Sequence, residues 1–116
     1  MTQTNSKASD RFEIRKSYFE TGDIWVETPY LNGKEHGTEK IYYKSGALLC
    51  ETPYVKGKIH GITRSYYESG ALERESPYVN GKRHGIVKNY NREKSNIDRL
   101  TLYNKGLIFL SLRREI

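Results

Sequence analysis

Apolar and polar residues alternate with a period of two along short segments of the chain, and turn residues separate these segments. In the segment ALLCETPY, at residues 47–54, alternation places Leu48 and Cys50 on one side of an extended chain and Leu49 and Glu51 on the other. No segment shows the 3.6-residue period of an amphipathic helix. The pattern therefore predicts an all-β protein built from short strands.

Two kinds of turn connect the predicted strands. The pairs Asn32–Gly33 and Asn80–Gly81 predict tight hairpin turns because both residue types accept positive φ, and Gly57 follows a lysine at the equivalent place. The other turn has the sequences ETGD, KSGA and ESGA, each with a glycine in the permissive position. Each unit of the chain therefore reads as a β-hairpin.

The predicted hairpin recurs every 24 residues without a slip. TPYLNGKEHG at 28–37 returns as TPYVKGKIHG at 52–61 and as SPYVNGKRHG at 76–85. Such a strict period marks a repeat array, and hairpins that are marginal alone must stack to be stable. We therefore predict an elongated, single-layer antiparallel meander. Positions that recur in register are expected to form its frame, among them Tyr42, Tyr66, Tyr90, Gly33, Gly57, Gly81, His36, His60, His84, Gly37, Gly61 and Gly85.

The repeats suggest a simple domain organisation. Residues 1–10 are polar and are expected to be disordered, and residues 11–112 are expected to form one domain. Its predicted units are 18–41, 42–65, 66–89 and a degenerate cap at 90–112 that lacks the proline and the His-Gly pair. Within the cap, LIFLSL at 107–112 is predicted to be a closing strand whose apolar edge could pair with a second chain.

Two local features carry more specific predictions. Each repeated proline cannot donate to a strand ladder, so Pro29, Pro53 and Pro77 are expected to mark a bulge or a strand end. The glycine after each repeated histidine is expected to leave room for a tyrosine ring against bare backbone.

Composition narrows the class of protein. The hydrophobic fraction is only 35%, so a deep core is not expected, and Cys50 is the only cysteine, which excludes an internal disulfide. No apolar run approaches about 18 residues, and the polar start of the chain lacks the apolar core of a signal peptide. A cytoplasmic protein is the expectation.

The net charge of +6 raises the question of nucleic-acid binding. The excess is scattered, and the unit at 18–41 is acidic whereas the unit at 42–65 is basic. A groove that follows phosphates would need the same sign in successive units, so nucleic acid is not the expected partner. The lysines that follow the turn glycines could still grip an anionic surface, or could simply be solvated, and they are Lys34, Lys58 and Lys82.

The repeated histidines are candidate metal ligands. Equivalent positions in successive units lie two strands apart, or roughly 10 Å, whereas ligand nitrogens lie about 2 Å from a zinc ion. One ion therefore cannot bind to neighbouring units, and a structural role is predicted, with each ring packed over a neighbouring turn. The histidines are His36, His60 and His84.

The repeated glutamates are candidate paired carboxylates. Glycosidases need two carboxyl groups roughly 5 to 9.5 Å apart, and the spacing between units lies just outside this range. Cross-strand pairs with basic residues are the preferred interpretation for Glu27, Glu51 and Glu75. No nucleophile–base pair, phosphate-binding glycine loop or zinc-ligand spacing is present, so we expect neither catalysis nor a cofactor.

The pattern Y-Y-x-S-G-x-L-x-x-E-x-P-Y-x-x-G-K-x-H-G at 66–85 resembles the MORN-variant repeat, over about residues 18–106. Arrays of this repeat are found in the bacterial YwqK-type family of toxin–antitoxin antitoxin components. The resemblance implies an elongated sheet of hairpins, and its antitoxin label implies a protein that neutralises a toxic partner protein. Relatives with the ordinary repeat are scaffolds, often dimeric and sometimes membrane-associated. The last unit departs from the pattern at Lys94, Thr101 and Leu102.

Together these observations predict a protein-binding module whose tyrosine and aliphatic side chains contact the partner. The alternative is a scaffold that self-associates or binds anionic membrane surfaces. Trp25 could be an exposed anchor or could be partly buried under residues 11–17. Specificity is expected at positions that differ between units. The predicted contact residues are Trp25, Leu49, Glu73, Glu35, Ile59 and Arg83, with a third variable set at Glu39, Thr63 and Val87.

Overall fold

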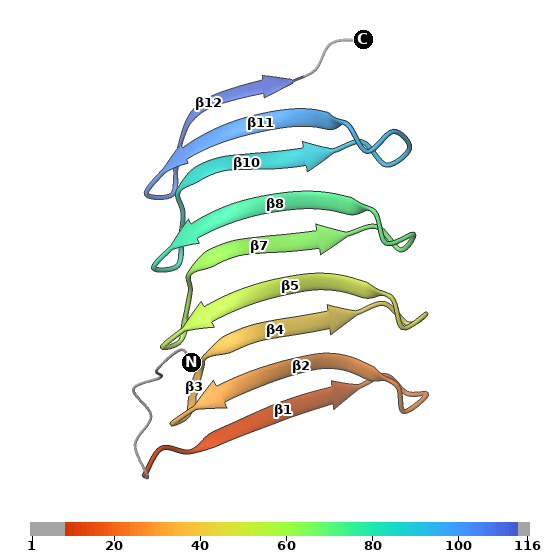
Figure 1. The fold of residues 1–116 in the computed structure, drawn as a ribbon, viewed down its shortest axis with the longest axis vertical. Coiled ribbons are helices and arrows are strands. Elements are labelled where there is room, and N and C mark those ends of the chain that lie inside the picture. Colours follow the sequence, from red (N-terminus) through yellow and green to blue (C-terminus); the bar gives the residue numbers. More distant parts are fainter. Residues whose placement is uncertain (1–8, 114–116) are drawn as a thin grey trace, which may run out of the picture.

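The computed structural model describes residues 9–113, which form one open antiparallel sheet of 12 strands with no helix among them (Figure 1). Hence this part of the chain has no helix that could cross a membrane. The strands are β1 (Phe12–Tyr18), β2 (Ile24–Leu31), β3 (Lys34–Glu35), β4 (Gly37–Tyr42), β5 (Leu48–Val55), β6 (Lys58–Ile59), β7 (Gly61–Tyr66), β8 (Leu72–Val79), β9 (Lys82–Arg83), β10 (Gly85–Tyr90), β11 (Ile97–Asn104) and β12 (Leu107–Arg113).

The strands follow one another across the sheet in chain order, as Figure 1 shows. The order is β1-β2-β4-β5-β7-β8-β10-β11-β12, and the two-residue strands β3, β6 and β9 pair with β2, β5 and β8 beside the tight turns. The molecule is elongated, with extents of 55 × 37 × 27 Å. The predicted all-β, single-layer meander of repeated hairpins is confirmed. The segment predicted to be disordered, 1–10, lies outside the described residues except for its last two positions.

Positive φ angles occur at the tight turns between the long strands and the two-residue strands. Asn32 and Gly33 have φ of 52° and 82°, and Lys56 at the equivalent place has φ of 48°. A lysine therefore adopts the conformation that asparagine accepts more readily, supported by the glycine that follows it. The last unit has the same turn at Lys105–Gly106, although its sequence has lost the proline and the His-Gly pair.

The prolines do not end the strands that carry them, but each stands opposite an irregularity in the partner strand: Thr28 and Pro29 of β2 face the four residues 36–39, between the β2–β3 and β2–β4 ladders. Pro29, Pro53 and Pro77 lie inside eight-residue strands, and the register shifts occur at the tyrosines that end the preceding strands, such as Tyr42. The Pro29 carbonyl accepts a hydrogen bond from the His36 backbone at 3.0 Å. The missing proline N–H points to this same side, where the paired β2–β4 ladder has ended, so no ladder bond is lost.

The glycine after each histidine lies against the proline of its own unit, and it stands directly opposite a tyrosine on the next strand, Tyr54 for Gly37 and Tyr78 for Gly61. A Cβ built on Gly37 would lie 2.9 Å from Pro29 Cγ, and one built on Gly61 would lie 3.1 Å from Pro53 Cγ. These glycines also have φ of 116° and 118°, which L side chains rarely adopt. The recurrence of proline and glycine eight residues apart is therefore a packing requirement of the sheet.

The two faces of the sheet differ. One face, which we call the threonine face, has small buried hydroxyl residues along its middle, Thr28, Thr52, Ser76 and Thr101. Val87 is the only buried hydrophobic residue in the described chain and lies on the same face, paired with Thr101. The other face, which we call the ladder face, carries a row of alternating charge in register. This row consists of Lys16, Glu27, Lys40, Glu51, Arg64, Glu75 and Lys88.

Candidate binding surfaces

The charged row of the ladder face is held by ion pairs and tyrosine hydroxyls. All three repeated glutamates stand opposite basic residues in register, and two of them form ion pairs. Arg64 Nε lies 3.0 Å from Glu75 Oε2, and Lys16 Nζ lies 3.8 Å from Glu27 Oε2. The third, Glu51, accepts a hydrogen bond from the Tyr66 hydroxyl at 2.7 Å. The repeated glutamates therefore hold neighbouring strands together.

The same contacts shift the protonation of their members. Burial and the hydrogen bond to Glu51 raise the pKa of Tyr66 to about 12. The Tyr90 hydroxyl donates to Glu75 at 2.7 Å, and this bond, with the Arg64 guanidinium, lowers the pKa of Glu75. Both shifts favour the hydrogen-bonded protonation state, as expected for structural networks.

Exposed aliphatic side chains form a line across the ladder face beside the charged row. Ile62 pairs with Pro77 on β8, Ile86 pairs with Leu102, and Leu102 pairs with Leu110 on the edge strand β12. We call these five residues the apolar row. Its aliphatic members are 37–52% exposed, so a considerable apolar surface has no covering layer.

Trp25 lies on the ladder face, on the other side of the charged row from the apolar row. Its side chain is 47% exposed and packs against Phe19, with ring centroids 5.9 Å apart. Residues 12–18 are not a cover for Trp25, because they form the first strand of the sheet and pair edge to edge with β2. Leu49 and Glu73 occupy the equivalent positions on β5 and β8.

The other predicted contact residues lie on the opposite face. Glu35, Ile59 and Arg83 pair with tyrosines of the threonine face in β2, β5 and β8. The two predicted triplets therefore cannot form one contact surface. The tyrosines of the repeated Pro-Tyr step also lie on the threonine face, away from the apolar row. The hydroxyl groups of Tyr66 and Tyr90 reach glutamates of the ladder face instead.

The repeated histidines link each hairpin to the next. His36 Nδ1 accepts a hydrogen bond from the Lys56 backbone, and His60 Nδ1 accepts one from Asn80, each at 3.3 Å. His84 makes the same contact with Lys105. Within residues 9–113, no three His, Cys, Asp or Glu side chains gather closely enough to hold a metal ion.

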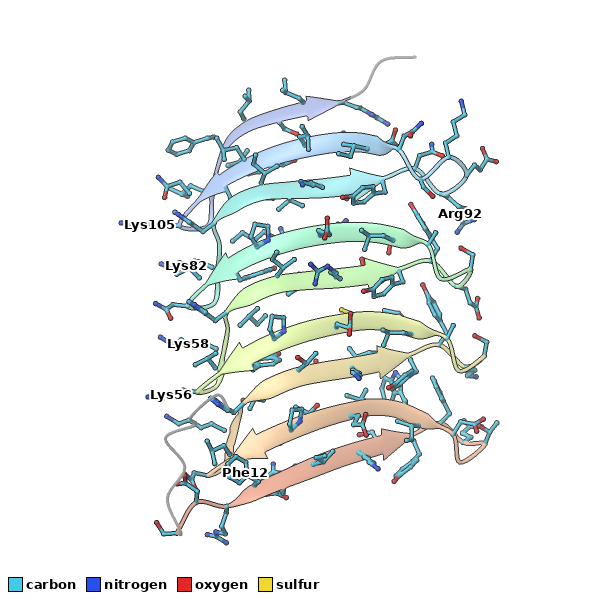
Figure 2. The ribbon with its side chains drawn as sticks, in the orientation of Figure 1. Phe12, Lys56, Lys58, Lys82, Arg92 and Lys105 are labelled. Carbon is cyan, nitrogen blue, oxygen red and sulfur yellow. The ribbon has the colours of Figure 1, made fainter. Side chains whose placement is uncertain are left out.

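Lysines project from the edge of the sheet that carries the tight turns. Figure 2 shows Lys56, Lys58, Lys82 and Lys105 along this edge, and none of them forms an ion pair with a described residue. Lys58, Lys82 and Lys105 line a hollow of about 520 Å³ with Val79 and His84, among others. We call this set of lysines, together with Lys34 on β3, the lysine edge.

Sequence reasoning did not identify a group of arginines at the C-terminal end of the threonine face. Arg74, Arg99 and Arg113 line a hollow of about 390 Å³ together with Arg83, the only one of the four that was a predicted contact residue. Arg74 and Arg99 occupy the same place on β8 and β11, which a longer fourth turn obscures in the sequence. Arg113 lies beside Arg99 only through the pairing of β11 with β12, which could not be predicted from the sequence.

The comparisons with known proteins agree with the repeat. A family model described as MORN repeat variant matches residues 14–32, 35–56 and 59–80. No curated protein and no solved structure matches the chain. The matched residues cover more than half of the chain, from β1 into the tight turn between β8 and β9.

Proposed function

Because the chain belongs to the MORN repeat variant family, a family of binding and scaffold modules, we propose that it recognises a protein partner through the apolar row. The observation that supports this proposal is the single layer of the sheet. Ile86, Leu102 and Leu110 lie side by side on β10, β11 and β12, and Ile62 on β7 lies beside Pro77 on β8. The four aliphatic side chains remain 37–52% exposed. Contiguous apolar surface of this kind marks interaction sites on soluble proteins.

The surroundings of the apolar row fit a protein interface. Such interfaces have an apolar centre and a polar rim. Here the charged row, with Arg64, Glu75 and Lys88, lies on one side, and Lys58 and Lys82 of the lysine edge lie on the other. A partner with an apolar centre and mixed charge around it would match this arrangement.

The finer form of the proposal is that the partner is a toxic protein which the chain neutralises. It rests on the resemblance to antitoxin components alone. It requires that the partner inhibits growth when it is produced without this chain.

The test is affinity capture from a lysate of the native host, followed by identification and stoichiometry of the bound protein. The variant Ile62→Asp/Ile86→Asp places two charges in the apolar row, and Ile59→Asp makes the same change on the threonine face. We expect one stoichiometric partner with the wild type and with Ile59→Asp, and its loss with the double variant. Capture that survives the double variant, with all three chains folded by circular dichroism, would contradict the proposal.

A second candidate function is supported by the lysine edge. Lys34, Lys58 and Lys82 project beside Val55 and Val79, which are 42% and 44% exposed. Basic and apolar side chains at one edge suit an anionic membrane surface. In this case phosphatidylserine vesicles should bind the chain, binding should fall steeply with salt, and the triple variant Lys34→Glu/Lys58→Glu/Lys82→Glu should abolish it. Vesicle binding that is insensitive to salt and to the triple variant would exclude this candidate.

A further inference from the structure

Four arginines converge on the hollow at the C-terminal end of the threonine face. Arg74, Arg99 and Arg113 belong to one row across β8, β11 and β12, in which Asn89 of β10 stands between Arg74 and Arg99. Arg83 reaches the same hollow from the two-residue strand β9. The hollow has a volume of about 390 Å³.

Neutral acceptors position three of these guanidinium groups. Arg74 Nε donates to Asn89 Oδ1 at 2.9 Å, and Arg99 Nη1 donates to Ser111 Oγ at 3.2 Å. Arg83 Nη1 donates to the Tyr103 hydroxyl at 3.3 Å. Each guanidinium carries five N–H donors, so these single bonds orient the groups and leave most of their donors available.

Arg83 is the most constrained of the four. Its guanidinium carbon lies 5.8 Å and 5.3 Å from the ring centroids of Tyr78 and Tyr103. Its Nε is buried and has no hydrogen-bond partner among the described residues. A buried donor without a partner is unfavourable, and an acceptor in the hollow could relieve this.

The described residues place no ion-paired carboxylate in the hollow. Among residues 9–113, no carboxylate oxygen lies within 4 Å of a nitrogen of these four arginines, and Asp98 is the only acidic residue that lines the hollow. Arg99 and Arg113 also stand directly opposite each other on neighbouring strands. Like charges in this position destabilise a sheet, so the arrangement calls for a counter-anion.

We propose that the arginine hollow binds a phosphomonoester group. Such a group carries a charge of about −1.5 to −2 and three acceptor oxygens, and guanidinium groups bind it with paired hydrogen bonds. A carboxylate offers one charge and two oxygens, and so leaves more of the four arginines unmatched. The hollow is at the small end of the range for ligand sites, about 300–1,000 Å³. The phosphoryl group could belong to a small phosphoester or to a phosphorylated side chain of a protein.

The arginine hollow is on the face opposite the apolar row. Phosphate binding there can therefore be tested independently of the proposed protein interface. Calorimetric titration of the full chain with inorganic phosphate, glycerol phosphate and a phosphoserine peptide distinguishes the two sources. Tighter binding of the peptide than of glycerol phosphate identifies a phosphorylated protein, and the reverse identifies a small phosphoester. The unphosphorylated peptide is the control ligand and should not bind.

Two variants test the arginines of the hollow, and a third is a control that makes the same change in charge elsewhere. Arg83→Gln and Arg99→Gln should each weaken binding of the preferred phosphoester at least about tenfold, because each removes a charged donor from the hollow. Arg92→Gln removes the same charge outside it. Arg92 lies in the turn before β11 with its guanidinium 5.3 Å from the Tyr67 ring centroid, at the edge opposite the lysines in Figure 2, and its removal should change binding less than about twofold.

Thermal unfolding separates ligand binding from a structural role. Without phosphate, Arg99→Gln should unfold at the same or a higher temperature than the wild type, because it relieves repulsion from Arg113. At the same phosphate concentration, the unfolding temperature should rise more for the wild type than for Arg99→Gln. Any of three results would overturn the proposal: no saturable binding of any phosphoester, equal loss in Arg92→Gln, or equal affinity for a DNA oligonucleotide that has only diester phosphates.

Discussion

Replacing Gly37 by alanine tests the packing unit that recurs through the sheet. Gly37 has φ of 116°, and a Cβ there would lie 2.9 Å from Pro29 Cγ. Gly46 also has a positive φ, of 93°, but a Cβ there meets nothing within 4 Å. Both substitutions should cost about 1–3 kcal/mol through the backbone conformation. Gly37→Ala should cost about 1 kcal/mol more, because the proline ring must shift.

Urea unfolding of both variants measures this difference, and a second substitution assigns its cause. In a Pro29→Ala background the ring is absent, so Gly37→Ala should become as mild as Gly46→Ala. Equal unfolding free energies for the two single variants would show that the contact with Pro29 adds no cost. So would a difference that persists after Pro29 has been replaced.

Three further predictions concern the contacts between strands. Tyr66 has a raised pKa, so its contribution should be fully present below pH 10 and lost as the pH rises towards about 12. Thermal unfolding should show the wild type more stable than Tyr66→Phe by about 1 kcal/mol at pH 8, with the gap closing in alkali, and a constant gap would contradict the contact with Glu51. Glu75 has a pKa lowered by its bond from Tyr90, so its contribution should be present above pH 4.5 and lost as the pH falls below it. The free energy of unfolding should therefore fall less steeply with decreasing pH for Glu75→Gln than for the wild type. An equally steep fall would count against this assignment. His60→Ala removes an acceptor for a turn amide and should cost about 1 kcal/mol by urea unfolding, whereas a neutral effect would show that the link is dispensable.

The hairpins could be predicted from the sequence because the information for them is local. The alternation in ALLCETPY and the pairs Asn32–Gly33 and Asn80–Gly81 specify strands and turns within a few residues. The 24-residue period then requires equivalent stacking of each hairpin on the next. The position of the irregularity at the proline could be predicted, but not that it falls in the partner strand, because this depends on a neighbour in space: the β2–β4 ladder ends before Pro29.

The candidate surfaces were harder to predict because they depend on register across strands. Trp25 and Glu35 both vary between units, but one lies on the ladder face and the other on the threonine face. Arg99 and Arg113 are 14 positions apart in the chain and become direct neighbours only through the pairing of β11 with β12. The register of this last hairpin includes a shift between Leu102 and Tyr103. No turn residue in the sequence indicates this shift.

The proposed function places a protein partner on the apolar row. Hydroxyl-radical footprinting of the chain, free and in complex with the captured partner, measures the exposure of each side chain directly. Labelling of Ile62, Ile86 and Leu102 should fall on binding, while that of Tyr54 and Ile59 on the threonine face should be unchanged. Protection of the threonine face with continued labelling of the apolar row would contradict it.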